Sequence, residues 1–306
     1  MTAPFSYRRR VGFGDCDPAR IYYTPRAFTY CVEAVEAWWE AVLSDSWTGL
    51  LARDGLEVRF FRARSEFARP LTVGQTVGVK VLVSDPGSDR IRFWLTGEDE
   101  AGERCFLADL AAGLYDRERD RIVPIPERDR ERIFGYASAF GIEGNPLSPQ
   151  GMTDPPPPPG RRTFPDRLFA RARRVAFGDC TPAGSADLPK IVEYAVETVG
   201  EWFEKVPGVS WLELVSVRMQ GAPAVSASCE LYRPVTAGRE MAMGVRVLRL
   251  GRASLSLLVE GNDPEEIPLF DVGMTVCFID QRDGFRSMPV PEELRRRIES
   301  YRRERE

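Results

Sequence analysis

The chain has 306 residues, enough for two ordinary domains. Its 43% hydrophobic and 29% charged residues are typical of a globular protein, and no apolar run approaches the ~20 residues that a membrane-spanning helix needs. The net charge is -4, with arginines interleaved among acids, so no basic face for nucleic acid is visible. There is no histidine, which excludes Ser-His-Asp and Cys-His machinery and the HExxH zinc motif.

The six cysteines form no CxxC pair, which indicates buried thiols rather than a disulfide framework or a zinc site. The N-terminal MTAPFSYRRR has no apolar stretch after its basic cluster and does not resemble a secretory signal. We therefore expect a cytoplasmic protein that uses neither a metal nor an organic cofactor.

The first elements along the chain are a short strand and a long helix. Val11–Phe13 reads as a strand that leads into a tight Gly-Asp-Cys turn. A helix then begins near Pro25, because proline suits the first helical turn. Its apolar residues recur every three or four positions, and alanines occupy much of the opposite face, so we expect a helix buried on most sides.

Four runs of β-type residues follow, separated by Pro-Gly and Ala-Gly turns: VRFFRARSEF, QTVGVKVLVSD, DRIRFWLTGED and CFLADLAAGLYD. One long apolar helix followed by four or five strands predicts the α+β class, with an antiparallel sheet wrapped around a central helix. Five consecutive prolines, Pro155 to Pro159, come next and predict an extended spacer.

The chain then repeats itself. Residues 9–42 and 173–206 align without a gap at a constant offset of 164, with 17 of 34 positions identical. SEFARPLTVG (65–74) aligns with CELYRPVTAG (229–238) at the same offset. We assign a first domain to residues 1–143, a linker to 144–165 and a second domain to 166–306. The two domains are expected to pair edge to edge as a covalent pseudo-dimer, and further homo-oligomers are left open.

The segment FGDCDPARIYYTPRAF and the helix after it resemble the signature of the 4-hydroxybenzoyl-CoA thioesterase family of hotdog proteins. The resemblance covers nearly the whole chain, twice, and implies two tandem hotdog domains. It also implies that Asp17 acts on a thioester carbonyl as nucleophile or general base, and that the backbone N–H of Thr24 holds the oxyanion. A helix N-terminus suits this second role, because it carries unpaired N–H groups and a partial positive charge.

The sequence departs from the family pattern at two positions: Arg20 stands where glycine is usual, and Thr24 where an aromatic residue or histidine is common. Asp17 could instead only form the turn, a common task for aspartate before proline. Asp15 is matched by Asp179 in the second copy, but Asp17 is matched by Thr181, which cannot supply a carboxylate. This difference favours a catalytic role for Asp17 in the first copy.

Four further residues are candidates for contacts with the substrate. Tyr22 and Tyr23 have no aromatic counterparts in the second copy and are expected to line a single working pocket. Arg90 and Arg252 are candidates for binding CoA phosphates.

Two acidic residues of the second copy and one matched pair of cysteines also bear on the chemistry. Asp187, just before Pro189, is expected to cap a helix, whereas Glu193 within that helix could face a cleft. Cys16 and Cys180 recur in both copies, which favours packing over nucleophilic chemistry.

The resulting hypothesis is an acyl-CoA thioesterase with one working site per chain, and by analogy with the family the acyl group could be aromatic. Two alternatives stay open. One is a thioesterase acting on carrier-protein-bound acyl or polyketide chains. The other is a non-catalytic acyl-CoA-binding protein, which would have no need of a carboxylate aimed at the thioester.

Overall fold

The computed structural model describes residues 3–84, 87–140, 159–165 and 169–303. Its first half contains β1 (Phe5–Arg10), a 3-10 turn η1 (Phe13–Asp15), α1 (Thr24–Leu43), α2 (Trp47–Asp54), β2 (Leu56–Phe67), β3 (Thr76–Val83), β4 (Arg90–Glu98), β5 (Arg104–Asp116), β6 (Arg121–Val123) and α3 (Glu127–Ala139). The four predicted strand runs correspond to β2, β3, β4 and β5.

The second half repeats this order. It contains β7 (Ala170–Arg174), η2 (Phe177–Asp179), α4 (Leu188–Lys205), α5 (Trp211–Ser216), β8 (Gln220–Gly221), β9 (Ala224–Leu231), β10 (Glu240–Leu250), β11 (Ser254–Asn262), β12 (Pro268–Cys277), β13 (Ile279–Asp280), β14 (Arg286–Ser287) and α6 (Glu292–Arg303). Among the described residues, no helix is long and apolar enough to cross a membrane.

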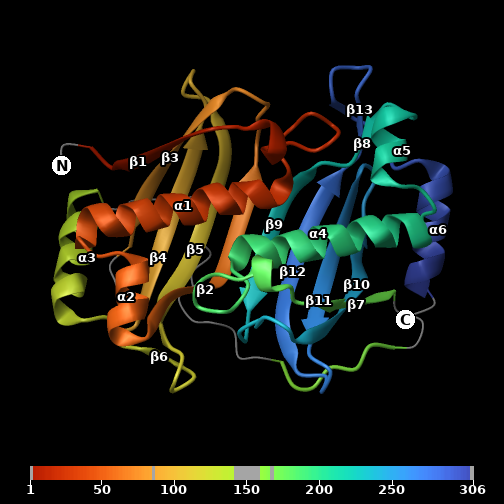
Figure 1. The fold of residues 1–306 in the computed structure, drawn as a ribbon. Coiled ribbons are helices and arrows are strands. Elements are labelled where there is room, and N and C mark those ends of the chain that lie inside the picture. Colours follow the sequence, from red (N-terminus) through yellow and green to blue (C-terminus); the bar gives the residue numbers. More distant parts are fainter. Residues whose placement is uncertain (1–2, 85–86, 141–158, 166–168, 304–306) are drawn as a thin grey trace.

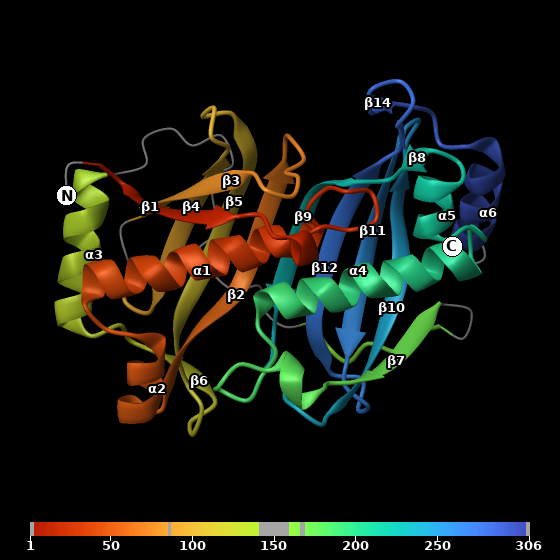
Figure 2. The same cartoon turned by 45° about the horizontal axis from the view of Figure 1, so that its top comes forward.

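The two halves share one continuous antiparallel sheet with the strand order β1-β3-β4-β5-β2-β9-β12-β11-β10-β7. The seam is the antiparallel pair β2–β9, in which Ala63 lies opposite Cys229 and Ser65 opposite Ala227. Helices α1 and α4 lie against the same face of the sheet, with their N-terminal parts beside each other near the seam (Figures 1 and 2). The predicted sheet around a central helix, and the pairing of the two copies, are confirmed.

The central helices are buried as expected. In α1, Phe28, Val35 and Trp38 are fully buried, and in α4 Trp202 is as well. Pro25 lies in the first turn of α1, where its missing N–H costs no hydrogen bond. The prediction of burial on most sides was too broad at Ala41, which is exposed because it lies on the outward face of the helix.

The predicted strand at Val11–Phe13 is wrong. The strand is β1, which pairs with β3 at the edge of the sheet, whereas Phe13 begins η1 and is 88% exposed. The alternation along β1 was hidden because its inward and outward positions include consecutive arginines, whose aliphatic stems can pack while their charges reach water. Similarly, the charged run after β6 forms α3, which buries only Ile133, Tyr136 and Ala137.

The end of the predicted linker lies on the second domain. The Arg162 guanidinium donates to Asp271 at 2.7 Å and to Glu260 at 3.2 Å, and Asn262 donates to the Arg162 carbonyl at 2.6 Å. Arg162 therefore fixes this segment to β11 and β12. Most of the predicted proline spacer, Pro155 to Pro158, lies outside the described residues.

Candidate active site

Asp17 lies in a tight turn between η1 and α1. Its Oδ1 accepts a hydrogen bond from the Ala19 N–H at 2.8 Å. Its own backbone N–H donates to the Ile21 carbonyl at 3.0 Å, and its carbonyl accepts from the Arg20 N–H at 2.8 Å. Asp17 therefore does form the turn, as the purely structural interpretation expected, but one carboxylate oxygen is enough for that task.

Asp15 fixes this turn to the helix and to the sheet. Its Oδ2 accepts from the Gly12 N–H at 2.8 Å, and its carbonyl accepts from the N–H of Tyr23, the residue that precedes α1, at 2.8 Å. Its carboxylate also pairs with Arg9 of β1 at 3.4 Å. Asp15 thus connects the turn that carries Asp17 to β1 through Arg9 and to the start of α1 through Tyr23.

Burial raises the pKa of Asp17 to about 6, although hydrogen bonds from the backbone of Ala19 and Ile21 oppose the rise. A carboxyl group with this pKa is mostly ionised at neutral pH but remains a stronger base than an exposed aspartate. The group is therefore suited to take a proton from water or to attack a carbonyl carbon.

The N-terminus of α1 begins next to this carboxylate and carries no side-chain cap. Thr24 is the first helical residue, Tyr23 precedes it without a capping hydrogen bond, and Pro25 has no N–H. Helix α4 differs at the matching position, because the Asp187 side chain accepts from the Lys190 N–H at 3.2 Å and caps the helix. The prediction that Asp187 is a cap is confirmed.

The matching turn in the second half has the same backbone geometry without the carboxylate. The Thr181 hydroxyl accepts from the Ala183 N–H at 3.2 Å and donates to the Ser185 carbonyl at 3.2 Å. The backbone bond from Gly184 to Thr181, at 2.8 Å, matches the bond from Arg20 to Asp17. Threonine thus keeps the turn and leaves out the charge.

Arg20 and its counterpart Gly184 both adopt the left-handed backbone conformation, with φ of +66° and +79°. Glycine adopts this conformation freely, whereas a residue with a Cβ is strained there by about 1–2 kcal/mol. The first turn therefore carries backbone strain beside the candidate catalytic residue, and the second does not.

The two candidate tyrosines point to different environments. Tyr22 is buried in the core, with its ring edge-on to Phe67 at 6.4 Å. Tyr23 is only partly buried, and burial, followed by the carboxylates of Glu197 and Glu193, raises its pKa. Tyr23 therefore lies where the first domain meets α4 of the second.

Glu193 also pairs with Lys190 at 3.0 Å. Its carboxylate is thus close both to Tyr23, on the first domain, and to a cation of its own helix.

The candidate arginines are not brought together. Arg90 begins β4 opposite Gly113, which in turn lies opposite Arg59 near the start of β2. The Asp17 turn is bonded instead to the segment after β2, through the Tyr22 N–H and the Leu71 carbonyl at 2.8 Å. Arg90 is therefore at the opposite end of the sheet.

Arg252 is exposed in the turn between β10 and β11, at the end of the sheet nearer to Asp17.

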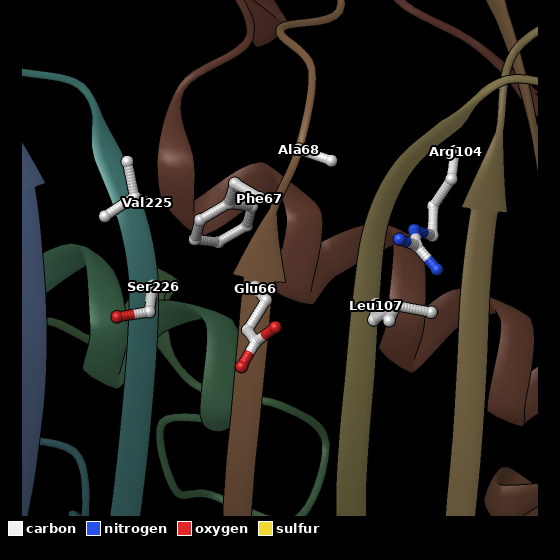
Figure 3. Close-up of a pocket in the computed structure, with 7 residues that line it drawn as sticks. All are labelled: Glu66, Phe67, Ala68, Arg104, Leu107, Val225 and Ser226. Carbon is white, nitrogen blue, oxygen red and sulfur yellow. The ribbon is translucent and has the colours of Figure 1, made fainter. Parts of the chain in front are cut away.

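A pocket of about 280 Å³ opens at this same end, across the seam between the domains (Figure 3). Phe67 lines it and also contacts Tyr22 in the core, whereas Glu66, next to the buried Ser65 on β2, lines it from the face of the sheet away from α1 and α4. The sequence did not reveal this pocket, because its walls come from three strands of two domains: Glu66, Phe67, Ala68, Arg104, Leu107, Val225 and Ser226.

The cysteines offer neither a thiolate nor a metal site. All six are free thiols, but only three of them are buried, so the prediction of buried thiols holds for half of them. Burial, followed by the carboxylates of Asp17 and Asp15, raises the pKa of Cys16, so this thiol is a poor nucleophile. Within the part of the chain that the structure describes, no group of three or more cysteine, aspartate and glutamate side chains could hold a metal ion.

No protein-family model matches the chain, and no curated protein matches its sequence. Its whole length is nevertheless similar to solved structures. A 12:0-ACP thioesterase from Umbellularia californica is 15% identical, with a TM-score of 0.69 over 90% of this chain and 95% of the other. A protein from Lactobacillus plantarum assigned as an oleoyl thioesterase is 13% identical, with a TM-score of 0.69 over 94% and 98%.

An acyl-ACP thioesterase from Bacteroides thetaiotaomicron is 10% identical, with a TM-score of 0.65 over 89% of this chain and 96% of the other. Each of these structures is matched over nearly its full length, as a pair of fused domains would require. The chain is therefore a double-hotdog protein, with the fold of these thioesterase structures along its whole length.

Proposed function

We propose that the chain is a thioester hydrolase that converts an acyl-CoA to a carboxylic acid and free CoA. The observation that carries this proposal is a half-buried carboxylate, Asp17, with a pKa of about 6 beside an uncapped helix N-terminus. A base and an oxyanion site next to each other are what acyl transfer to water needs, and neither depends on histidine.

In the general-base form of the reaction, Asp17 removes a proton from a water molecule as the water oxygen attacks the thioester carbonyl carbon. The carbonyl oxygen becomes an oxyanion, which the Thr24 N–H stabilises. The C–S bond then breaks, the electron pair leaves with sulfur, and the proton held by Asp17 neutralises the thiolate. In the nucleophilic form, Asp17 attacks the carbonyl carbon, the C–S bond breaks and the CoA thiolate leaves. Water then hydrolyses the anhydride, which frees the acid and the Asp17 carboxylate, and the proton released neutralises the thiolate.

The second half supports the first rather than repeating its chemistry. Thr181 supplies no carboxylate, and the Asp187 side chain caps the start of α4 through the Lys190 N–H. We therefore infer one catalytic site per chain, with α4 and β9 forming the other wall of the seam.

A carrier-protein thioester is the second candidate substrate. It is favoured by the full-length similarity to the structures of two acyl-ACP thioesterases. Matched pairs of substrates that carry the same acyl group on CoA and on a carrier protein distinguish the two.

The test is release of free thiol from a panel of acyl- and aroyl-CoA esters by wild type and by Asp17→Asn. Asparagine keeps the size and turn propensity of aspartate but loses the charge, so we expect turnover to fall at least about a hundredfold. The matched control is Thr181→Ala, which alters the same position of the other turn. A loss below about tenfold, or ~1.4 kcal/mol of barrier, would exclude Asp17 as the catalytic group.

If the wild type binds these esters but releases no thiol, the chain is a non-catalytic acyl-CoA-binding protein and the proposed hydrolase function is wrong.

A further inference from the structure

Arg20 is a strained, exposed cation three residues after Asp17. Its φ of +66° lies in the region that favours glycine, and Gly184 stands at the same position of the second turn. The backbone bonds of the two turns match, so an arginine is not required to form this turn. Strain that the local structure does not need is typically retained at functional sites.

The Arg20 side chain does not serve the turn electrostatically either. Among the described residues it forms no ion pair and no side-chain hydrogen bond, and its side chain is exposed. Its charge is therefore available to a group from outside the protein.

A second cation with an unused donor lies nearby, in the first turn of α1. The Nε of Arg26 is buried without a hydrogen-bond partner within the described part of the chain. Its counterpart in α4, Lys190, is neutralised by Asp179 at 3.4 Å and by Glu193 at 3.0 Å. The cation in the first turn of α1 thus has no ion-pair partner among the described residues, whereas the cation at the matching position of α4 is paired.

We propose that Arg20, assisted by Arg26, binds an anionic group of the substrate beside Asp17. Guanidinium groups pair with both phosphate and carboxylate through two parallel hydrogen bonds, so two sources are compatible. One is the phosphate at the end of the pantetheine arm, and the other is a carboxylate carried by the acyl group. This inference rests on the proposed thioester hydrolysis and names a recognition element for it.

The test is Arg20→Gly, which places in the first turn the residue that the second turn already has. Removing the strain should raise Tm by about 2–4 °C, whereas losing a charge-assisted bond should raise KM at least about tenfold. Arg20→Lys keeps a charge and should restore part of the affinity. Ser44→Gly relieves a left-handed residue, φ +57°, at the far end of α1, and should leave KM unchanged.

Two pairs of substrates distinguish which anion Arg20 binds. If the phosphate is bound, Arg20→Gly weakens acyl-CoA but not the same acyl group on pantetheine, which lacks the phosphate. If an acyl carboxylate is bound, the variant loses affinity for a CoA thioester whose acyl group carries a free carboxylate. Its affinity for a CoA thioester with a plain alkyl acyl group does not change. The reciprocal Gly184→Arg is not a clean control, because an Arg117 Nη lies 3.6 Å from where its Cβ would stand.

Calorimetric titration with CoA and with a simple dicarboxylate separates this inference from the proposed function, because it needs no turnover. A wild type that binds one of these anions, more weakly after Arg20→Gly, supports the subsite even if no thiol is released. A variant whose KM and anion affinity match those of wild type for every probe overturns it.

Discussion

Helices α1 and α4 begin in the same way but differ in the groups that accept hydrogen bonds from their first backbone N–H groups. Both follow a 3-10 turn, both carry proline in the first turn, and both lie against the same face of one sheet. At α4 the Asp187 side chain accepts from the Lys190 N–H, whereas at α1 no side chain caps the helix and the equivalent Arg26 N–H donates to the Tyr23 carbonyl at 2.8 Å. Asp17 adds a carboxylate beside the start of α1, and Thr181 adds none beside α4.

In a duplicated domain, one copy can keep the interactions that the fold needs while the other carries the residues that catalysis needs. The second copy keeps every hydrogen bond that the turn needs and satisfies its own helix, as an ordinary structural element does. The first copy leaves the Arg26 Nε unpaired, half-buries the Asp17 carboxylate and strains Arg20. Features that destabilise a fold are expected where binding and catalysis need them.

The largest effect should come from separating the halves. Residues 1–150 alone would expose the edge of β2 and leave Arg62 without Glu230, with which it makes bonds of 2.8 and 2.9 Å across the seam. We expect this half to be dimeric or insoluble, because an unpaired strand edge associates with other edges, and to release no thiol above background. Size-exclusion chromatography with light scattering and the thiol assay check this.

The control is the full chain cut at a protease site introduced at Gly151. It should remain one particle with full activity, because the strands stay paired. A soluble, monomeric and fully active 1–150 fragment would contradict the requirement for the second half.

The pH dependence should come next in size. Because Asp17 must be ionised and its pKa is about 6, kcat/KM should fall about tenfold for each pH unit below that value. The effect on stability has the opposite sign. The folded state binds the Asp17 proton more tightly than the unfolded state, in which the pKa of Asp17 is near 3.8. Protonation therefore stabilises the fold fully below pH 3.8, and this stabilisation is lost as the pH rises through about 6.

Initial rates from pH 4.5 to 8 measure the first effect, and urea unfolding of wild type and Asp17→Asn at both ends of the range measures the second. Rates that stay nearly constant down to pH 5 would give Asp17 the pKa of an exposed aspartate and contradict its burial.

The smallest effect should come from the second turn. The Thr181 hydroxyl is occupied by the turn, and no base is present to activate it, so Thr181→Ala should keep turnover within a few-fold of wild type. Glu193→Gln is expected to be similarly mild, because this carboxylate already pairs with Lys190. If either variant loses as much activity as Asp17→Asn, the second copy contributes chemistry and the one-site proposal fails.

Much of the fold was predictable because its signals are local. The constant offset between the copies fixed their equivalence, and the long runs of β-type residues fixed β2 to β5. The failures were also local in cause. Strand β1 is rich in arginine and helix α3 in arginine and acids, so their periodicity is carried by few apolar residues, such as Tyr7 and Ile133.

The candidate site was predictable only where the two copies could be compared. Asp17 and Asp187 were identified from their neighbours in the chain, since turns and caps depend on adjacent residues. The positions of Tyr22, Arg90 and the pocket at the seam were not, because they depend on which strands lie side by side.

The sequence by itself determined that the chain is a tandem duplication and that the carboxylate of Asp17 has no counterpart in the second copy, where Thr181 stands. Only the tertiary structure decided what surrounds that carboxylate. The burial that raises the pKa of Asp17, and the approach of α4 to Tyr23, arise when segments far apart in the chain pack together. Desolvation and charge proximity depend on distances in space, and a linear sequence does not specify these until the sheet has closed the seam between β2 and β9.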